Sequence, residues 1–203
     1  MASTPENLTG LTTTSTNSSK EYLPSELGVW MFVLGDMLVF SVLFGSYAWE
    51  RAQQHGLFIT AQSELNQTFG VVNTILLLTG SLFVVLALHA ARKGKIKHTQ
   101  QLLLLAISTG VGFFINKVFE YRDKISNGFT LLSNDFFMFY YMLTGIHLLH
   151  VCVGTGALIY LYKRLSVQGL STDYIKHLES GGIVWHMVDL LWIALFPLLY
   201  LIK

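Results

Sequence analysis

Charged residues are scarce in this sequence: Asp, Glu, Lys and Arg make up 12% of its 203 residues, about half the share found in an ordinary soluble domain. The formal net charge at pH 7 is only +1, so no basic surface indicates a nucleic-acid partner and no acidic tail indicates a cationic one. The single cysteine, Cys152, has no second cysteine with which to form an intrachain disulfide. The composition therefore argues against a nucleic-acid-binding protein and excludes a disulfide-stabilised one.

Apolar residues, by contrast, make up 52% of the chain and are gathered into long blocks. A helix of about 20 apolar residues spans the roughly 30 Å hydrocarbon core of a bilayer. Five such blocks lie at residues 27–49, 70–89, 102–121, 136–162 and 183–202. The sequence therefore predicts an all-α integral membrane bundle of five transmembrane helices, occupying residues 25–203.

The N-terminal segment differs in composition from the rest of the chain. Its first twenty residues, MASTPENLTGLTTTSTNSSK, are rich in Ser, Thr and Asn and lack the basic start and short apolar core of a signal peptide. We expect residues 1–24 to form a flexible cytoplasmic tail.

Basic residues predict the orientation of the spans, because Lys and Arg favour cytoplasmic loops. With five spans, the tail, the second loop and the fourth loop share one side of the membrane. That side carries Lys20, Arg92, Lys93, Lys95, Lys97, Lys163, Arg164 and Lys176, whereas Arg51, Arg122, Lys124 and Lys203 lie opposite. We therefore expect a cytoplasmic N-terminus and a C-terminus on the outer side.

Several ionisable side chains fall inside the predicted spans, where each costs roughly 2.5–3.5 kcal/mol at a helix centre. Some are three residues apart and so share a helix face. These pairs are Lys117 with Glu120, His147 with His150, and His186 with Asp189, and the first span adds Asp36. We expect the pairs to face the bundle interior. Asp36 should face other helices or bound lipid, with His150 as its nearest candidate partner by depth.

His and carboxylate side chains on facing helices are the ligands of di-iron sites in helical bundles, so these residues are candidates for such a site. No Glu-x-x-His motif occurs, and only one predicted span holds two histidines near its centre. We therefore expect neither metal nor haem in this chain. The same side chains would instead hydrogen-bond between helices or contact lipid headgroups. Trp185, near the start of the fifth predicted span, is expected to be an interfacial anchor.

Four segments of the chain resemble the cytochrome c oxidase subunit III family. They are WMFVLGDMLVFSVLFGSYAW from Trp30, NTILLLTGS from Asn73, TGIHLLHVCVG from Thr144 and ESGGIVWHMVDLLWIALF from Glu179, together with the pair Glu120 and Tyr121. The resemblance extends from about Gly28 to the C-terminus. The Thr-Gly-x-His-x-x-His and Trp-His-x-x-Asp-x-x-Trp segments, occurring in this order, are highly specific.

The resemblance implies an accessory subunit without redox centres, bound beside a catalytic large subunit that holds the haem and copper. It also implies bound phospholipid, support of proton uptake, and a location in the bacterial inner (cell) membrane. The chain would then belong to an oxidoreductase complex without holding its active site. Residues with buried polar, lipid-related or proton-related roles would be Asp36, Glu120, His147, His150, Glu179, Trp185, His186 and Asp189.

Asp36 occupies the position of a carbodiimide-reactive acid that is usually glutamate in the family. The aspartate looks more like the five-helix quinol oxidase branch and the accessory proteins of nitric oxide reductases. Two further interpretations remain from the residues themselves, namely an independent proton or ion transporter and a small haem enzyme. The electron donor, the terminal acceptor, the bound lipids and the need for the subunit in turnover are not recorded in the sequence.

Overall fold

The computed structural model describes residues 27–202, and this part of the chain is built from helices without strands. The predicted tail at residues 1–24 lies outside the described residues. The helices are α1 (Leu27–Gln53), α2 (His55–Ser63), α3 (Gln67–Arg92), α4 (Ile96–Ser126), α5 (Asp135–Gln168), α6 (Thr172–Phe196) and the π-helical segment η1 (Pro197–Leu201).

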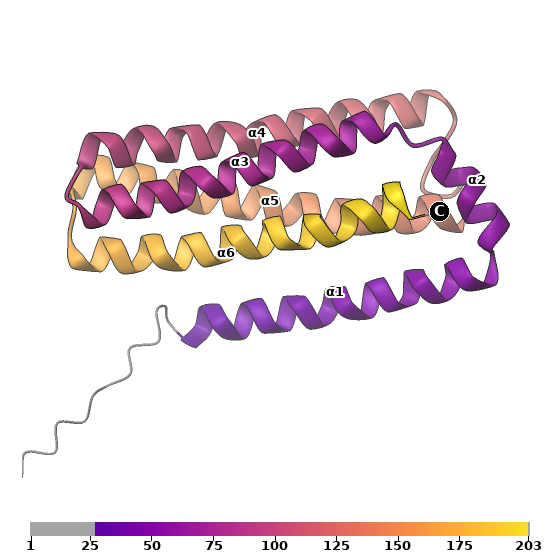
Figure 1. Cartoon of the computed structure of the whole chain (residues 1–203), viewed down its shortest axis with the longest axis horizontal. Coiled ribbons are helices and arrows are strands. Elements are labelled where there is room, and N and C mark those ends of the chain that lie inside the picture. The colour runs from indigo at the N-terminus through magenta and orange to yellow at the C-terminus, as the bar shows by residue number, and fades with distance from the viewer. Residues whose placement is uncertain (1–26, 203) are drawn as a thin grey trace, which may run out of the picture.

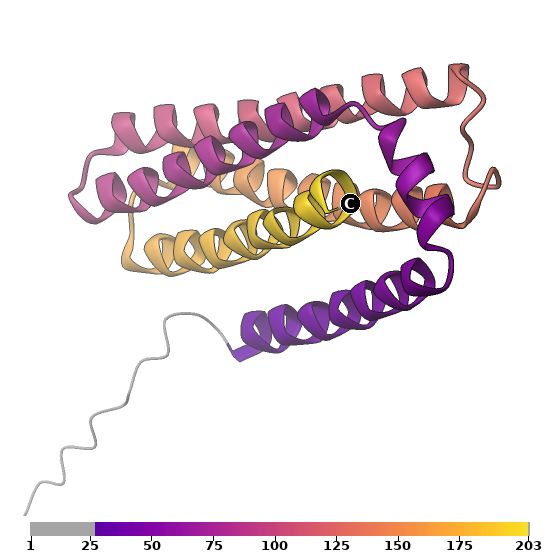
Figure 2. The ribbon, with the colours of Figure 1, turned by 45° about the vertical axis from the view of Figure 1, so that its right-hand side comes forward.

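Five of these helices are long and apolar enough to cross a membrane, the last formed by α6 and η1 together. The prediction of an all-α five-span bundle is thus confirmed, and the chain is a multi-pass membrane protein. The short helix α2 was not expected; it crosses one end of the molecule and joins α1 to α3 (Figure 2). The fifth span also starts earlier than expected, at Thr172 rather than near residue 183.

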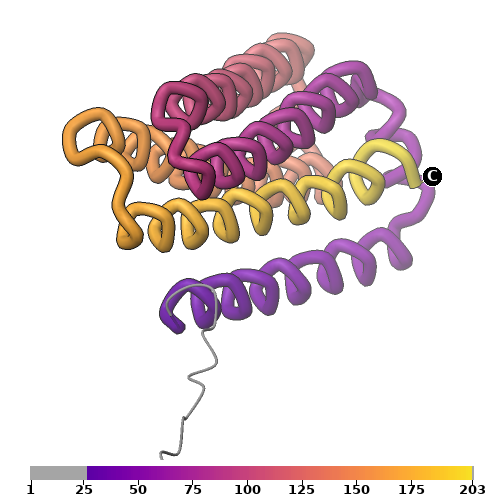
Figure 3. Tube along the Cα trace, turned by 60° about the vertical axis from the view of Figure 1, so that its left-hand side comes forward, coloured from indigo at the N-terminus to yellow at the C-terminus, as the bar shows by residue number. Residues whose placement is uncertain are grey.

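Helices α3 to α6 form a four-helix bundle, in which each helix packs against two neighbours. Helix α1 lies along α5 and α6, outside this bundle (Figures 1 and 3). Glycines lie in two of the turns between helices, Gly94 between α3 and α4 and Gly169 between α5 and α6. Their φ angles are +73° and +71°, in a region that favours glycine. Asn134 and Ser171 cap α5 and α6 by accepting hydrogen bonds from backbone N–H groups.

Helix α1 is far less buried than the bundle helices. Only Phe40 and Tyr47 are buried along its length. In its most apolar stretch 6% of the residues are buried, against 50% in that of the last span. At the end of α1 near α2, Arg51 donates to the Ile202 carbonyl at 2.7 Å, and Gln54, between the two helices, donates to Asp135 at 2.6 Å. Much of α1 therefore presents apolar side chains outward.

The last span changes helix type at Pro197. Proline has no N–H to donate into the helix ladder, and the backbone continues as η1, in which the Ile202 N–H donates to the Pro197 carbonyl at 2.9 Å. This wider turn places Tyr200 in the protein interior, with 1% of its surface exposed.

Candidate functional site

A fully buried ion pair lies in the half of the bundle near α2. Lys117 and Glu120 are one turn apart on α4, and neither side chain is exposed (0% each). The Lys117 ammonium donates to Glu120 Oε2 at 2.8 Å. This is the pairing that their spacing indicates. Either charge alone would carry a large desolvation cost at this position, so the two side chains depend on each other.

Two tyrosines from other helices complete the pair. Tyr140 on α5 donates to Glu120 Oε1 at 2.8 Å, and the Tyr200 hydroxyl of η1 donates to the same oxygen. The Lys117 ammonium also donates to the Tyr200 hydroxyl at 3.0 Å. We call these four residues the Lys117–Glu120 cluster. Both carboxylate oxygens are bonded, so the cluster links α4, α5 and η1.

Aromatic rings surround the Lys117 ammonium. Its Nζ lies 4.9 Å from the ring centroid of Tyr140 and 5.2 Å from that of Trp192. The rings of Tyr121 and Tyr200 follow at 5.4 and 5.6 Å. Ring faces attract cations at such distances, most strongly where water is excluded. The pair is therefore satisfied entirely within the chain, as a structural ion pair is.

Asp36 forms a second interhelical pair, between α1 and α5. Its Oδ1 lies 3.0 Å from His150 Nε2, and the two side chains are 11% and 14% exposed. The other ring nitrogen of His150 lies 2.8 Å from the Ile146 carbonyl oxygen. Asp36 thus faces another helix, and its partner is the histidine that depth indicated. Its second oxygen, Oδ2, is buried and has no hydrogen-bond partner in residues 27–202.

The structure separates the two histidines of α5. His147 points into the bundle core, where its ring centroid lies 5.2 Å from that of Trp192 and 5.5 Å from that of Phe113. It is fully buried, and neither ring nitrogen bonds to another of the described residues. His147 and His150 therefore have different surroundings, although they are three residues apart.

His186 meets a serine of α3. Ser81 Oγ lies 2.6 Å from His186 Nδ1. Asp189, one turn further along α6, is 6% exposed, and its Oδ1 is buried without a partner among the described residues. Halfway along their helices, Ser81 and His186 connect α3 to α6.

Glu179 and Trp185 have surroundings that the sequence interpretation did not predict. Glu179, expected to be a buried polar residue, is 20% exposed and accepts a hydrogen bond from Arg92 at 2.7 Å. Trp185, expected at the membrane interface, is 1% exposed inside the bundle. Both corrections have one cause: α6 begins at Thr172, which places Glu179 at the end of the bundle and Trp185 deep within it.

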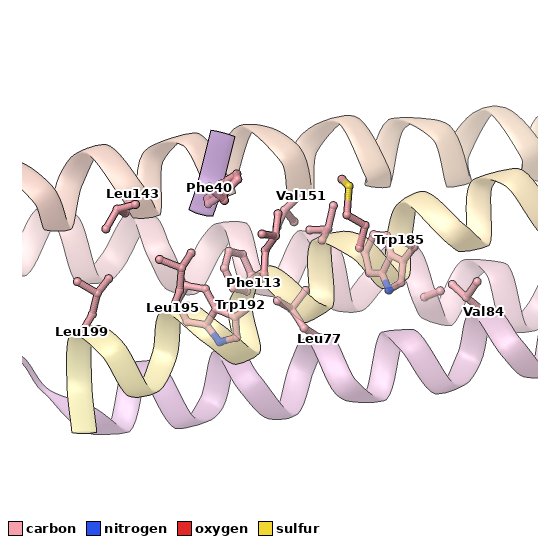
Figure 4. Packing of buried hydrophobic residues seen from close by; sticks show 14 of the residues in the cluster. Phe40, Leu77, Val84, Phe113, Leu143, Val151, Trp185, Trp192, Leu195 and Leu199 are labelled. Carbon is pink, nitrogen blue, oxygen red and sulfur yellow. The ribbon is translucent and has the colours of Figure 1, made fainter. Parts of the chain in front are cut away.

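Trp185 occupies a slot lined by glycines from three helices. A Cβ added to Gly80 of α3, Gly110 of α4 or Gly154 of α5 would lie 3.1, 3.0 or 3.3 Å from the nearest atom of the Trp185 ring. We call these four residues the Trp185 layer. Figure 4 shows Trp185 and Trp192 extending from α6 into the core, with Trp192 beside Phe113. The small residues let the helices approach closely around the indole.

The histidines do not converge as metal ligands would. In residues 27–202, no three His, Cys, Asp or Glu side chains form a group that could hold a metal ion. His150 is paired with Asp36, His186 with Ser81, and His147 lies among aromatic rings. The chemistry these side chains offer is hydrogen bonding and ion pairing between helices.

The sequence interpretation missed three residues of these contacts, namely Ser81, Tyr140 and Tyr200. For the tyrosines a signal was available, because a Lys–Glu pair inside a membrane requires further hydrogen-bonding groups at the same depth. No comparable signal marks Ser81, since hydroxyl side chains in membrane helices often bond to their own backbone.

Comparison with known proteins gives consistent results over nearly the whole chain. The family described as cytochrome c oxidase subunit III matches residues 9–203. The chain is 29% identical over 177 residues to "Probable cytochrome c oxidase subunit 3" of Mycobacterium tuberculosis (strain H37Rv), covering 87% of each protein. It is 26% identical over 185 residues to "Cytochrome c oxidase subunit 3" of Bacillus sp. (strain PS3), covering 91% of this chain and 89% of that one.

A third relative has a different length. The chain is 29% identical over 182 residues to "Heme-copper oxidase subunit I+III" of Aeropyrum pernix, which covers 86% of this chain but only 22% of that protein. The matched range contains all five spans. The chain therefore belongs to the cytochrome c oxidase subunit III family.

Proposed function

We propose that this chain works as the accessory subunit III of a haem-copper oxidase, bound along a large catalytic subunit in the membrane. The observation that carries the proposal is the family match across residues 9–203. The Aeropyrum relative, named as subunits I and III in one protein, supports a lasting association between this chain and the large subunit. The internal polar contacts agree with an accessory role, because they join helices to one another.

Haem and copper belong, in this proposal, to the large subunit and not to this chain. The reason is the donor set: His147, His150 and His186 each have a separate set of neighbours, whereas a metal or haem requires ligands converging on one point. The subunit would contribute lipid binding and support of proton uptake to the complex. Exposed apolar side chains along α1 provide a surface for lipid tails.

The proposed location is the bacterial cell membrane, with the α3–α4 and α5–α6 turns in the cytoplasm. Both turns lie at the end of the bundle away from α2 (Figure 1). Ion pairs join helices there, between Arg92 and Glu179 at 2.7 Å and between Arg164 and Asp173 at 2.6 Å. This end carries most of the Lys and Arg residues, which favour the cytoplasmic side. Reporter fusions in the two turns should report a cytoplasmic location; an external signal from either would overturn the orientation.

Copurification tests the function itself. An affinity-tagged chain should be extracted from its own membranes in mild detergent, and the large protein that accompanies it identified by mass spectrometry and by its haem spectrum. We expect a stoichiometric haem-copper large subunit, and we expect the chain, once separated from it, to lack a Soret band. An identified nitric oxide reductase would favour the accessory protein of denitrification instead.

Two other results would reject an accessory role. If the chain purified alone and moved protons across reconstituted vesicles, it would be an independent transporter. If the isolated chain held stoichiometric haem, it would be a haem protein in its own right, with His147, His150 and His186 as the first ligand candidates.

A further inference from the structure

His186 is a polar group within the last span that the chain does not fully enclose. The helix of this span extends from Thr172 to Leu201, and His186 lies halfway along it. Its Nδ1 is 2.6 Å from Ser81 Oγ, and both residues are only partly buried. None of the described residues bonds to Nε2, and this atom is not among the buried polar atoms that lack a partner. The outer edge of this imidazole is therefore accessible.

The chemistry of the ring determines what this edge presents. Ser81 Oγ is the partner of Nδ1, so Nε2 is the ring nitrogen that remains for a further hydrogen bond. In the neutral ring Nε2 is either a donor or an acceptor, according to which nitrogen carries the proton. In both tautomers His186 presents a hydrogen-bonding nitrogen to the outside of the chain.

Exposed apolar side chains surround Nε2 of His186. Leu78 and Val85 share the face of α3 that carries Ser81, and Leu190 and Ile193 share the face of α6 that carries His186. Their exposed fractions lie between 46% and 51%. We call this surface the α3–α6 face, formed by Leu78, Ser81, Val85, His186, Leu190 and Ile193. The outward surface of α4 differs, because Leu104, Val111, Ile115 and Val118 cover it and require no polar partner in lipid.

We propose that the α3–α6 face is the surface that binds the catalytic subunit, and that a hydrogen-bonding side chain on a transmembrane helix of that subunit binds His186 Nε2. This inference rests on the proposed function. Hydrocarbon tails have no hydrogen-bonding group, and His186 lies seven residues beyond Glu179, about 10 Å further along the helix axis from the end of the bundle. An unsatisfied polar group in hydrocarbon costs several kcal/mol, so a neighbouring helix is the partner that this depth favours. Apolar side chains around the nitrogen allow that helix to pack closely.

Site-specific photo-crosslinking in the whole complex tests the surface. A photoreactive amino acid is placed at Leu190 on the α3–α6 face, and in a matched control at Val111 on the outward surface of α4. Copurification of the large subunit is verified first; if it fails for the unmodified chain, the proposed function itself has failed. With copurification established, we expect a covalent adduct with the large subunit from position 190 and none from position 111. No adduct from position 190, or equal yields from both positions, would overturn the inference.

Two substitutions of His186 test the hydrogen bond. In His186→Asn the amide can still reach Ser81 but offers nothing at the position of Nε2, whereas His186→Gln places an amide group near that position. We expect His186→Asn to weaken association with the large subunit about fivefold, the effect of one net hydrogen bond, and His186→Gln to weaken it less. Association is measured as the subunit fraction retained through increasing detergent. The control is His89→Asn, at an exposed site near the end of α3.

Folding is checked for each variant through its expression level and melting temperature, so that a misfolded variant is not scored as weak binding. If His186→Asn folds and remains bound as tightly as the wild type, the proposed hydrogen bond is rejected. The outer edge of His186 then faces water or lipid rather than a polar side chain of the large subunit. If it fails to fold, the crosslinks from positions 190 and 111 still decide the location of the surface.

Discussion

The Lys117–Glu120 cluster and the Trp185 layer hold the same four-helix bundle together by opposite means. In the cluster, two charges and two hydroxyls are matched in number, and every contact has a direction. In the layer, three glycines leave just enough room for one indole. Removing a charged group from the cluster destabilises the bundle, because the remaining charge then loses its partner. Adding an atom to the layer destabilises the bundle, because the helices are already in contact.

The largest effect is expected from removing one charge of the cluster. Glu120→Leu leaves the Lys117 ammonium buried without its carboxylate, and we expect the free energy of unfolding in mixed micelles to fall by about 3–5 kcal/mol. Lys117→Met combined with Glu120→Leu should recover most of this loss, since neither charge remains. Glu179→Gln is the control, because its partly exposed pair with Arg92 should contribute about 0–1 kcal/mol. A double variant as unstable as Glu120→Leu would show that packing, rather than the stranded charge, accounts for the loss.

A smaller loss is expected when one methyl group is added to the Trp185 layer. In Gly110→Ala the new Cβ would overlap Thr155 Oγ1 and lie 3.0 Å from the Trp185 ring, and overpacking of this kind costs about 1–3 kcal/mol. Gly112→Ala is a matched control two residues away, because its Cβ would meet only Leu76, at an ordinary 3.5 Å. Both variants are compared by their unfolding midpoints in denaturing detergent. Equal midpoints would mean that the glycine slot is not tight.

The Asp36–His150 pair differs from the Lys117–Glu120 pair in burial, because its side chains are 11% and 14% exposed rather than fully buried. It therefore tests whether a less buried polar pair contributes less to assembly. Asp36→Leu removes the acceptor that faces His150 and should weaken assembly of the complex by about 1–3 kcal/mol. Asp36→Asn keeps a hydrogen-bonding side chain of the same size, so assembly and steady-state electron transfer should remain largely intact. Both are measured as complex yield and oxygen consumption. An assembled Asp36→Asn complex without electron transfer would contradict an accessory role for this site.

The smallest effect is expected from one hydroxyl of the cluster. Tyr200→Phe removes one donor to Glu120 Oε1, which still accepts from Tyr140, and we expect a loss of about 1 kcal/mol in unfolding free energy. Tyr160→Phe, at a side chain that is 59% exposed, should leave stability unchanged. A loss from Tyr200→Phe as large as that from Glu120→Leu would show that the Tyr200 hydroxyl contributes as much to stability as the Glu120 carboxylate.

The sequence predicted the spans well because apolar blocks of membrane length have few alternatives to a transmembrane helix. It also predicted pairs whose members lie on one helix or at one depth, such as Lys117 with Glu120 and Asp36 with His150. Both follow from distances along a helix axis, which a sequence contains directly.

Contacts that depend on how helices rotate against one another were not predictable in this way. Ser81 meets His186 only because α3 and α6 are neighbours with particular faces together. Trp185 was misplaced because polar residues before the apolar block continue the helix back to Thr172, so its depth could not be read from hydropathy. His147 was grouped with His150 by spacing, yet a difference of three residues was enough to turn one toward the core and the other toward α1.

The position of Tyr200 also has a consequence for biosynthesis. Tyr200 belongs to η1, at the far end of the last span, so the ribosome has already delivered Lys117, Glu120 and Tyr140 to the membrane before this tyrosine emerges. During that interval the Glu120 carboxylate has one tyrosine donor instead of two, and the Lys117 ammonium still lacks the Tyr200 hydroxyl as a partner. The nascent bundle therefore remains incompletely closed until its final turn is inserted.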